Sequence, residues 1–261
     1  MMIPFSQGSN FHACRFLPTL TLLAAGIPAV AQQATVSAPL SADEVMRRVA
    51  QMNEQRANAL ETYSSIRTYH LECHCLSHKE ADMVVRTEYE APNKKVFTIV
   101  SESGSGTVRS RVFKKLLEAE QESMREENQQ RSAITPQNYT FELTDYRTIG
   151  GNELYVLDAQ PLTQNKFLFR GRIWVDANAF AIARVEGEPA VNPSWWTVKT
   201  DFKRSYQEIS SIWLPESNES ETKVRIFGTA VLTIKYGEYQ ITEAHNSNTA
   251  LDVEEKPSNG Q

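Results

Sequence analysis

The densest group of side chains able to do chemistry lies in one short stretch, which contains His70, Glu72, Cys73, His74, Cys75 and His78. Thiolates and imidazoles are the ligands that zinc and copper prefer in proteins. Successive side chains on a β-strand point to opposite faces, however, so the three histidines share one face with the glutamate and the two cysteines share the other. A site that used both ligand types would need a bend in the strand.

This stretch therefore favours thiols that face the core and imidazoles that face water, and we expect no metal ion and no cofactor. A disulfide between Cys73 and Cys75 is awkward, because Cα atoms two residues apart on a strand are separated by about 6.6 Å, at the outer limit for a bridge. Two nearby thiols in an exported protein still leave open a metal or redox role of the Cys73–Cys75 segment.

Catalytic motifs are absent from the sequence. It contains no Gly-x-Ser-x-Gly elbow, no His-Glu-x-x-His pair and no phosphate loop. Carboxylates such as Glu186 and Glu188 occur along the chain, but their spacing on a strand does not identify an acid–base pair. We therefore expect no catalytic residues and a protein that is not an enzyme.

Aromatic side chains crowd the second half of the chain. Around residues 167–175 apolar side chains fall on both faces of a predicted strand, so each face is either covered by a helix or exposed to a ligand. An apolar cavity is the default binding site for such a ligand. The candidate ligand-binding residues are Phe167, Phe169, Ile173, Val175, Phe180, Trp195, Trp213 and Phe227.

The N-terminal segment is typical of a secretory signal peptide. Arg15 is followed by an apolar run over residues 16–27 and then by a small-x-small site ending at Ala31. The run is too short to span a membrane, and no other stretch is long and apolar enough to do so. We expect cleavage after Ala31 and a soluble, exported product without a transmembrane segment. Residues 32–243 then form a single domain, and residues 244–261 a flexible polar tail.

The domain begins with a capping box at Ser41 and a helix to about Leu60, where the period of the apolar residues changes to two. A second helix is predicted over residues 114–131, preceded by a short strand over residues 107–111. The remaining patterns predict about eleven antiparallel strands in all. We expect an α+β fold in which one highly curved sheet carries the helices on its concave face, and two helices scarcely fill that concavity.

The composition excludes one large class of partner. The chain has 261 residues, with 27 Lys and Arg against 32 Asp and Glu, and its formal net charge is −5. A nucleic-acid-binding protein needs a basic surplus to neutralise phosphates, so we expect no nucleic-acid partner. Hydrophobic residues make up 41% of the chain, which is enough for a sizeable core.

The sequence resembles the outer-membrane lipoprotein-sorting proteins, the LolA, LolB and RseB-like periplasmic family. The resemblance covers about residues 41–243 and rests on a strand-turn-strand pattern, Trp174-Val175-Asp176 followed by Ala183-Arg184-Val185-Glu186, and on Trp213-Leu214-Pro215 in a later strand. One departure concerns a Pro-x-x-Phe-Arg strand whose arginine helps to hold the family's lid. The equivalent segment here, residues 92–97, has no arginine at that place.

The resemblance implies a half-open, incomplete β-barrel whose apolar cavity, lidded by helices, holds an acyl chain. We therefore expect a periplasmic binding protein for a lipid or lipoprotein acyl chain, with a role in lipoprotein sorting. The alternative is an envelope sensor of the same fold that recognises a protein partner.

Overall fold

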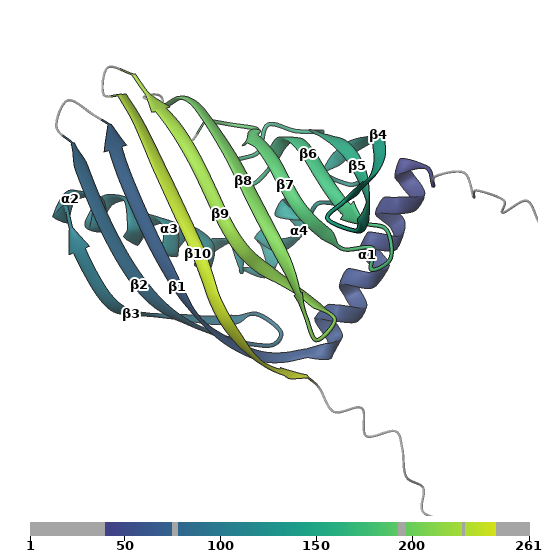
Figure 1. Cartoon of the computed structure of the whole chain (residues 1–261), viewed down its shortest axis with the longest axis horizontal. Helices are drawn as coiled ribbons and strands as arrows, with labels where there is room; N and C mark the ends of the chain where they lie inside the picture. The colour runs from purple at the N-terminus through teal and green to yellow at the C-terminus, as the bar shows by residue number, and fades with distance from the viewer. Residues whose placement is uncertain (1–39, 75–77, 193–196, 226–227, 244–261) are drawn as a thin grey trace, which may run out of the picture. The chain divides into compact units, whose positions relative to one another are not determined.

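Figure 1 shows the computed structural model of the chain, which describes residues 40–74, 78–192, 197–225 and 228–243. All of these residues belong to one compact unit. The predicted signal peptide and the predicted tail lie outside the described residues. None of the described helices has the length and apolarity that crossing a bilayer requires.

One antiparallel sheet of ten strands contains most of the described chain. The strands are β1 (Leu60–His74), β2 (Lys79–Glu90), β3 (Lys94–Gly104), β4 (Tyr139–Ile149), β5 (Asn152–Pro161), β6 (Phe169–Asp176), β7 (Ile182–Pro189), β8 (Thr197–Ile209), β9 (Ile212–Val224) and β10 (Gly228–Glu243). Their order across the sheet is β3-β2-β1-β10-β9-β8-β7-β6-β5-β4.

The first and last strands of the chain, β1 and β10, pair in the interior of this sheet. From this pair, successive hairpins lead outward to the two edges. Among the described residues the edge strands β3 and β4 each pair with one neighbour, so the sheet is not closed. The predicted α+β class with a curved, open antiparallel sheet is confirmed (Figure 1).

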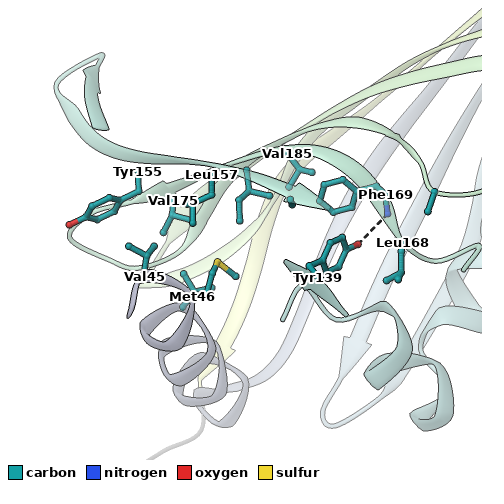
Figure 2. Packing of buried hydrophobic residues seen from close by; sticks show 13 residues of the cluster. Val45, Met46, Tyr139, Tyr155, Leu157, Leu168, Phe169, Val175 and Val185 are labelled. Atoms are coloured by element: carbon teal, nitrogen blue, oxygen red, sulfur yellow. Dashed lines mark hydrogen bonds between the residues drawn. The ribbon is translucent and has the colours of Figure 1, made fainter. Parts of the chain in front are cut away.

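Helix α1 (Ala42–Ala59) covers one part of the sheet. The Ser41 hydroxyl accepts a hydrogen bond from the Glu44 amide at 3.3 Å, which is one half of the predicted capping box. The Glu44 carboxylate pairs instead with Arg47 and Arg48. Val45, Met46 and Val49 lie on the buried side of the helix. They pack in one core cluster with side chains of β4, β5, β6 and β7, as Figure 2 shows.

A second group of helical segments follows β3. It comprises α2 (Gly106–Val108), a π-helical segment η1 (Arg109–Phe113), α3 (Lys114–Ser123) and α4 (Glu126–Ser132). Val108, Phe113 and Leu117 are buried against Tyr69, Leu71 and neighbouring side chains of β1, β2 and β10. The two helical groups therefore cover two separate parts of the sheet.

Two predictions about this region are wrong. The strand predicted at residues 107–111 is helical, so the described sheet has ten strands where we expect about eleven. Gly104 has a φ of +76° at the end of β3, and the turn there leads the chain onto the face of the sheet, where Val108 and Phe113 become buried. The helix predicted over residues 114–131 is interrupted at Met124 and Arg125, between α3 and α4.

Candidate functional site: a cavity under helix α3

A cavity with a volume of about 630 Å³ lies between the sheet and the helical segments η1 and α3. This is within the usual range for small-molecule sites, roughly 300–1,000 Å³. Two smaller hollows, of about 490 and 420 Å³, include carboxylates in their linings, whereas the lining of the first cavity has none and is rich in apolar side chains. The cavity under α3 is therefore the best candidate for an apolar ligand.

Apolar side chains from both layers line this cavity. The helical layer contributes Val112 and Leu116, and the turn before β6 contributes Phe167 and Leu168. The sheet contributes Leu71, Phe169, Pro189, Phe202, Val224, Ala230 and Leu232. Phe169 and Phe202 meet edge to face, with ring centroids 5.7 Å apart. These walls provide the contact that the methylene groups of a ligand require.

Tyr139 of β4 holds Phe169 in position through a hydrogen bond and a ring contact. The Tyr139 hydroxyl accepts a hydrogen bond from the Phe169 backbone amide at 3.2 Å, and the two rings lie 5.3 Å apart (Figure 2). Tyr139 is only 2% exposed. Because a buried amide without a partner is costly, this bond helps to hold the Phe169 ring at the cavity wall.

A stripe of small polar side chains from β8 and β9 also lines the cavity, and its members are Thr197, Thr200, Asn218, Ser220 and Thr222. The hydroxyls of Thr200 and Thr222 hydrogen-bond to each other at 3.1 Å. The Oδ1 atom of Asn218 is buried without a hydrogen-bond partner in the described part of the chain. It can accept a hydrogen bond from a polar group of a ligand or from water.

Four cations complete the lining: Arg111, Lys115, Lys166 and Arg204. Lys166 is paired with Glu122 at 2.8 Å, whereas Arg111 and Lys115 are exposed and form no ion pair with any described residue. The described lining includes no carboxylate. In a chain whose net charge is −5, the cavity therefore has a locally positive surround.

A buried ion-pair network attaches α3 to the sheet beside the cavity. Arg67 of β1 is 1% exposed, and its guanidinium donates to both carboxylate oxygens of Glu120, at 2.8 and 3.1 Å. Lys95 of β3 donates to the same carboxylate at 2.5 Å. Arg67 also lies over the Tyr236 ring, 4.7 Å from its centroid. Burial raises the pKa of the Tyr236 hydroxyl, which is therefore neutral at pH 7.

The predicted ligand-binding residues fall into three groups. Phe167 and Phe169 line the cavity. Ile173 and Val175 are fully buried in the core cluster under α1, Phe180 packs against that cluster, and Trp213 is half-buried on β9 outside the lining. Trp195 and Phe227 lie outside the described residues. Ligand contact by these side chains stays a prediction, and the geometry favours it most for Phe167 and Phe169.

Sequence reasoning missed the helical and polar parts of the lining. The sequence predicts the helix over residues 114–131, but helical periodicity does not show which part of the sheet it covers, so Val112 and Leu116 are not identified as lining. The polar part had a usable signal: Asn218, Ser220 and Thr222 alternate along β9 with Glu219 and Glu221. Because side chains alternate between the faces of a strand, this pattern places small side chains on one face, where they leave space.

Cys73 packs against the core cluster of β1 and β2, on the side that strand alternation predicts. It is disulfide-bonded, so its sulfur is not available as a thiolate ligand. The two other cysteines of the chain, Cys14 and Cys75, lie outside the described residues. The sequence analysis expects a thiol at Cys73, and this expectation is wrong. Its argument against a disulfide concerned only a bridge from Cys73 to Cys75, and Cys75 lies outside the described residues.

No protein-family model matches the sequence, and no curated protein matches it significantly. Among solved structures, the chain is similar to a domain from Vibrio parahaemolyticus named for outer membrane lipoprotein sorting. The identity is 11% and the TM-score 0.40, over 80% of this chain and 95% of that one. A LolA superfamily protein from Nitrosomonas europaea is 10% identical with a TM-score of 0.36, over 79% and 96% of the two chains.

A third similar structure is MucB of Pseudomonas aeruginosa, solved together with MucA. It is 10% identical with a TM-score of 0.26, over 76% of this chain and 93% of that one. At identities of 10–11% and TM-scores of 0.40 and below, these three structures identify neither the family of this chain nor its ligand.

Proposed function

We propose that this protein is a non-enzymatic binding protein of the periplasm that holds the acyl chain of an anionic lipid or lipoprotein in the cavity under α3. One observation carries the proposal: a cavity of about 630 Å³ combines apolar walls with four cations and no carboxylate in its described lining. Apolar walls favour hydrocarbon, and the cations favour an acidic group at its end. A role in outer-membrane lipoprotein sorting would use the same site.

The apolar walls predict how affinity depends on the length of the acyl chain. Each buried methylene contributes about 0.8 kcal/mol, so three additional methylenes should increase affinity by about fiftyfold until the cavity is full. The polar stripe on β8 and β9 narrows the ligand class further. A purely apolar ligand would leave Asn218 Oδ1 without a partner, whereas the N–H of an amide, a hydroxyl group or a bound water can donate a hydrogen bond to it.

The charge of the rim predicts a preference for acids over neutral ligands of equal length. Arg111 and Lys115 are exposed beside the cavity without an ion-pair partner among the described residues, so they can pair with a carboxylate or phosphate of the ligand. An interaction of this kind at the surface is weak and falls with salt concentration. It should therefore add selectivity to binding that the apolar walls dominate.

The experiment is displacement of a fluorescent fatty acid from the purified exported protein, by saturated fatty acids and by the alcohols of the same lengths. We expect affinity to rise with chain length and acids to bind more tightly than alcohols. Lys115→Glu should reduce the preference for acids by about fivefold. Lys114→Glu is the matched control, because Lys114 is the adjacent exposed lysine and does not line the cavity.

Affinity that does not change with chain length would contradict the proposal. Native mass spectrometry of freshly purified protein provides an independent measurement, since a co-purified acyl ligand should appear as added mass.

A second candidate function is the envelope sensor. The observation that favours it is the edge strand β3, which exposes Ile99 and Val100 beside unpaired backbone groups. Such an edge can pair with an extended segment of a protein partner. Recovery of an envelope protein with no co-purified lipid, abolished by Val100→Lys, would favour this candidate.

A further inference from the structure

The exposed face of the β1–β2 hairpin gathers three histidines and three carboxylates. His70, Glu72 and His74 occupy every second position along β1, and Glu80 and Asp82 do the same along β2. His78 lies just before β2. The intervening residues Tyr69, Leu71, Ala81 and Met83 are buried in the core. Strand alternation therefore turns the five polar side chains that lie on β1 and β2 away from the cavity side. The proposed lipid site uses none of them.

Glu72, His74 and His78 converge on a common point. The His74 Nε2 atom lies 3.5 Å from Glu72 Oε1, and the His78 Nε2 atom lies 4.0 Å from the same oxygen. The three ligand atoms lie within 4.8 Å of one another. The two nitrogen–oxygen separations are longer than normal hydrogen bonds, so the nitrogens approach the carboxylate without bonding to it.

These separations are close to those of a metal site. In a tetrahedral zinc site with bonds of about 2.0 Å, neighbouring ligand atoms lie about 3.3 Å apart. Small rotations of the side chains would therefore bring the three atoms onto one ion. The side chains have room to rotate, because His74 and His78 are 59% and 57% exposed. Two imidazoles and a carboxylate are a common three-ligand set for Zn²⁺, with water in the fourth position.

The neighbouring residues add a second reason for a cation here. Glu72 and Glu80 are directly opposite each other in the pairing of β1 with β2. Like charges in this arrangement destabilise a sheet, and a bound cation would relieve the repulsion. The disulfide at Cys73 removes that sulfur as a competing ligand.

The adjacent group, His70 with Glu80 and Asp82, is already engaged. His70 Nδ1 lies 2.8 Å from Asp82 Oδ1, and the Ser103 hydroxyl donates to the other oxygen of Asp82 at 3.3 Å. A metal at this group would have to break the first of these bonds. This makes His70 a control residue on the same face.

We propose that Glu72, His74 and His78 bind one Zn²⁺ ion and so connect the end of β1 to the beginning of β2. The sequence prediction of no metal weighed a site that included the thiols, whereas this site uses the imidazole face alone. Binding of the ion to the folded chain stabilises it in proportion to the zinc concentration.

The test is calorimetric titration of chelator-treated, tag-free full-length protein with ZnCl₂. We expect one ion per chain. His74→Ala, His78→Ala and Glu72→Gln should each lower the affinity by about tenfold or more. His70→Gln should leave the affinity unchanged. All four side chains are well exposed, so the variants should fold, and urea unfolding without zinc checks this.

A second readout is the melting temperature, which zinc should raise in the natural protein and in His70→Gln but not in His74→Ala. The proposal is overturned if zinc does not bind, or if it binds to His74→Ala and His78→Ala with the natural affinity. Loss of binding in His70→Gln alone would also overturn it, because the ion would then belong to the adjacent group.

Discussion

The Nη1 atom of Arg67 donates to both carboxylate oxygens of Glu120, which lies 53 residues further along the chain. This bond joins β1 to α3, and so joins the sheet to the helix that covers the cavity. The sequence resemblance directed attention to residues 92–97, which lack the family's arginine. In this chain β1 supplies an arginine that contacts the covering helix, and Lys95 of that same segment contributes the second cation.

Substitution of Arg67 should strongly destabilise the protein. Arg67→Met leaves the Glu120 carboxylate with Lys95 as its one remaining cation among the described residues, and removing one partner of a buried ion pair costs up to about 3–5 kcal/mol. Urea unfolding measures the free energy. The matched control is Lys94→Met, because the exposed pair of Lys94 with Glu90 contributes little. Equal effects of the two substitutions would contradict the buried role of Arg67.

Glu120 should make stability depend on pH in the acid range. Burial raises the pKa of its carboxyl, but Lys95 and Arg67 outweigh burial and lower this pKa below its ordinary value of 4.5. A lowered folded-state pKa stabilises the fold above the unfolded-state value, and this contribution is lost as pH falls through the folded-state value. The difference in unfolding free energy between the natural protein and Glu120→Gln should therefore be constant near neutrality and shrink below about pH 4.5.

The measurement is urea unfolding of both proteins across the acid range. A difference in unfolding free energy that shrinks as the pH falls is expected only if Glu120 is ionised and paired in the folded protein. A difference that persists unchanged down to low pH would mean that the carboxyl is not stabilised by the two cations.

The sequence predicts the strands of the sheet more accurately than the helical segments that cover it. The sequence predicts a strand over Tyr139–Ile149, between Pro136 and Gly150, and β4 has these bounds. Residues 107–111 were mistaken for a strand, since Thr107 and Val108 are β-branched and have high β-propensity. Their helical conformation depends on burying Val108 and Phe113 against β1 and β2, which is a tertiary effect that local pattern does not contain.

The candidate site was predictable to a similar extent. A concave apolar face with too few helices to fill it followed from the strand pattern, and Phe167 and Phe169 lie at the cavity. Ile173 and Val175 have the same alternation as Phe169 but lie under α1. One face of β6 is therefore covered by α1 in one part and lines the cavity in another. This division depends on where α1 and α3 lie over the sheet, which the sequence pattern does not specify.

Gly187 should be intolerant of any side chain. It is the pairing partner of Gly171, and a Cβ atom on Gly187 would overlap the backbone carbonyl oxygen of Arg170. Gly187→Ala should therefore destabilise the protein by about 1–3 kcal/mol in urea unfolding, because the two strands must separate. The control is Gly106→Ala, where the nearest atom would be 3.7 Å away in a flexible side chain. A helical alanine there should be neutral or stabilising. If both substitutions leave the free energy of unfolding unchanged, the close approach of β6 and β7 at Gly187 does not contribute to stability.

Filling the cavity should weaken acyl binding without unfolding the protein. Ala230 of β10 lines the cavity, and Ala230→Phe places a ring in the space that the proposed ligand uses. If the ring displaces about two methylenes of the ligand, affinity for a long fatty acid should fall by about tenfold. The loss should be smaller for short acids, because they need less of the space.

Val198→Phe is the matched control, since Val198 is exposed on β8 and does not line the cavity. Displacement titrations of both variants measure the effect. Equal affinity of Ala230→Phe and Val198→Phe for long acids, with both folded in urea unfolding, would place the acyl chain outside this cavity.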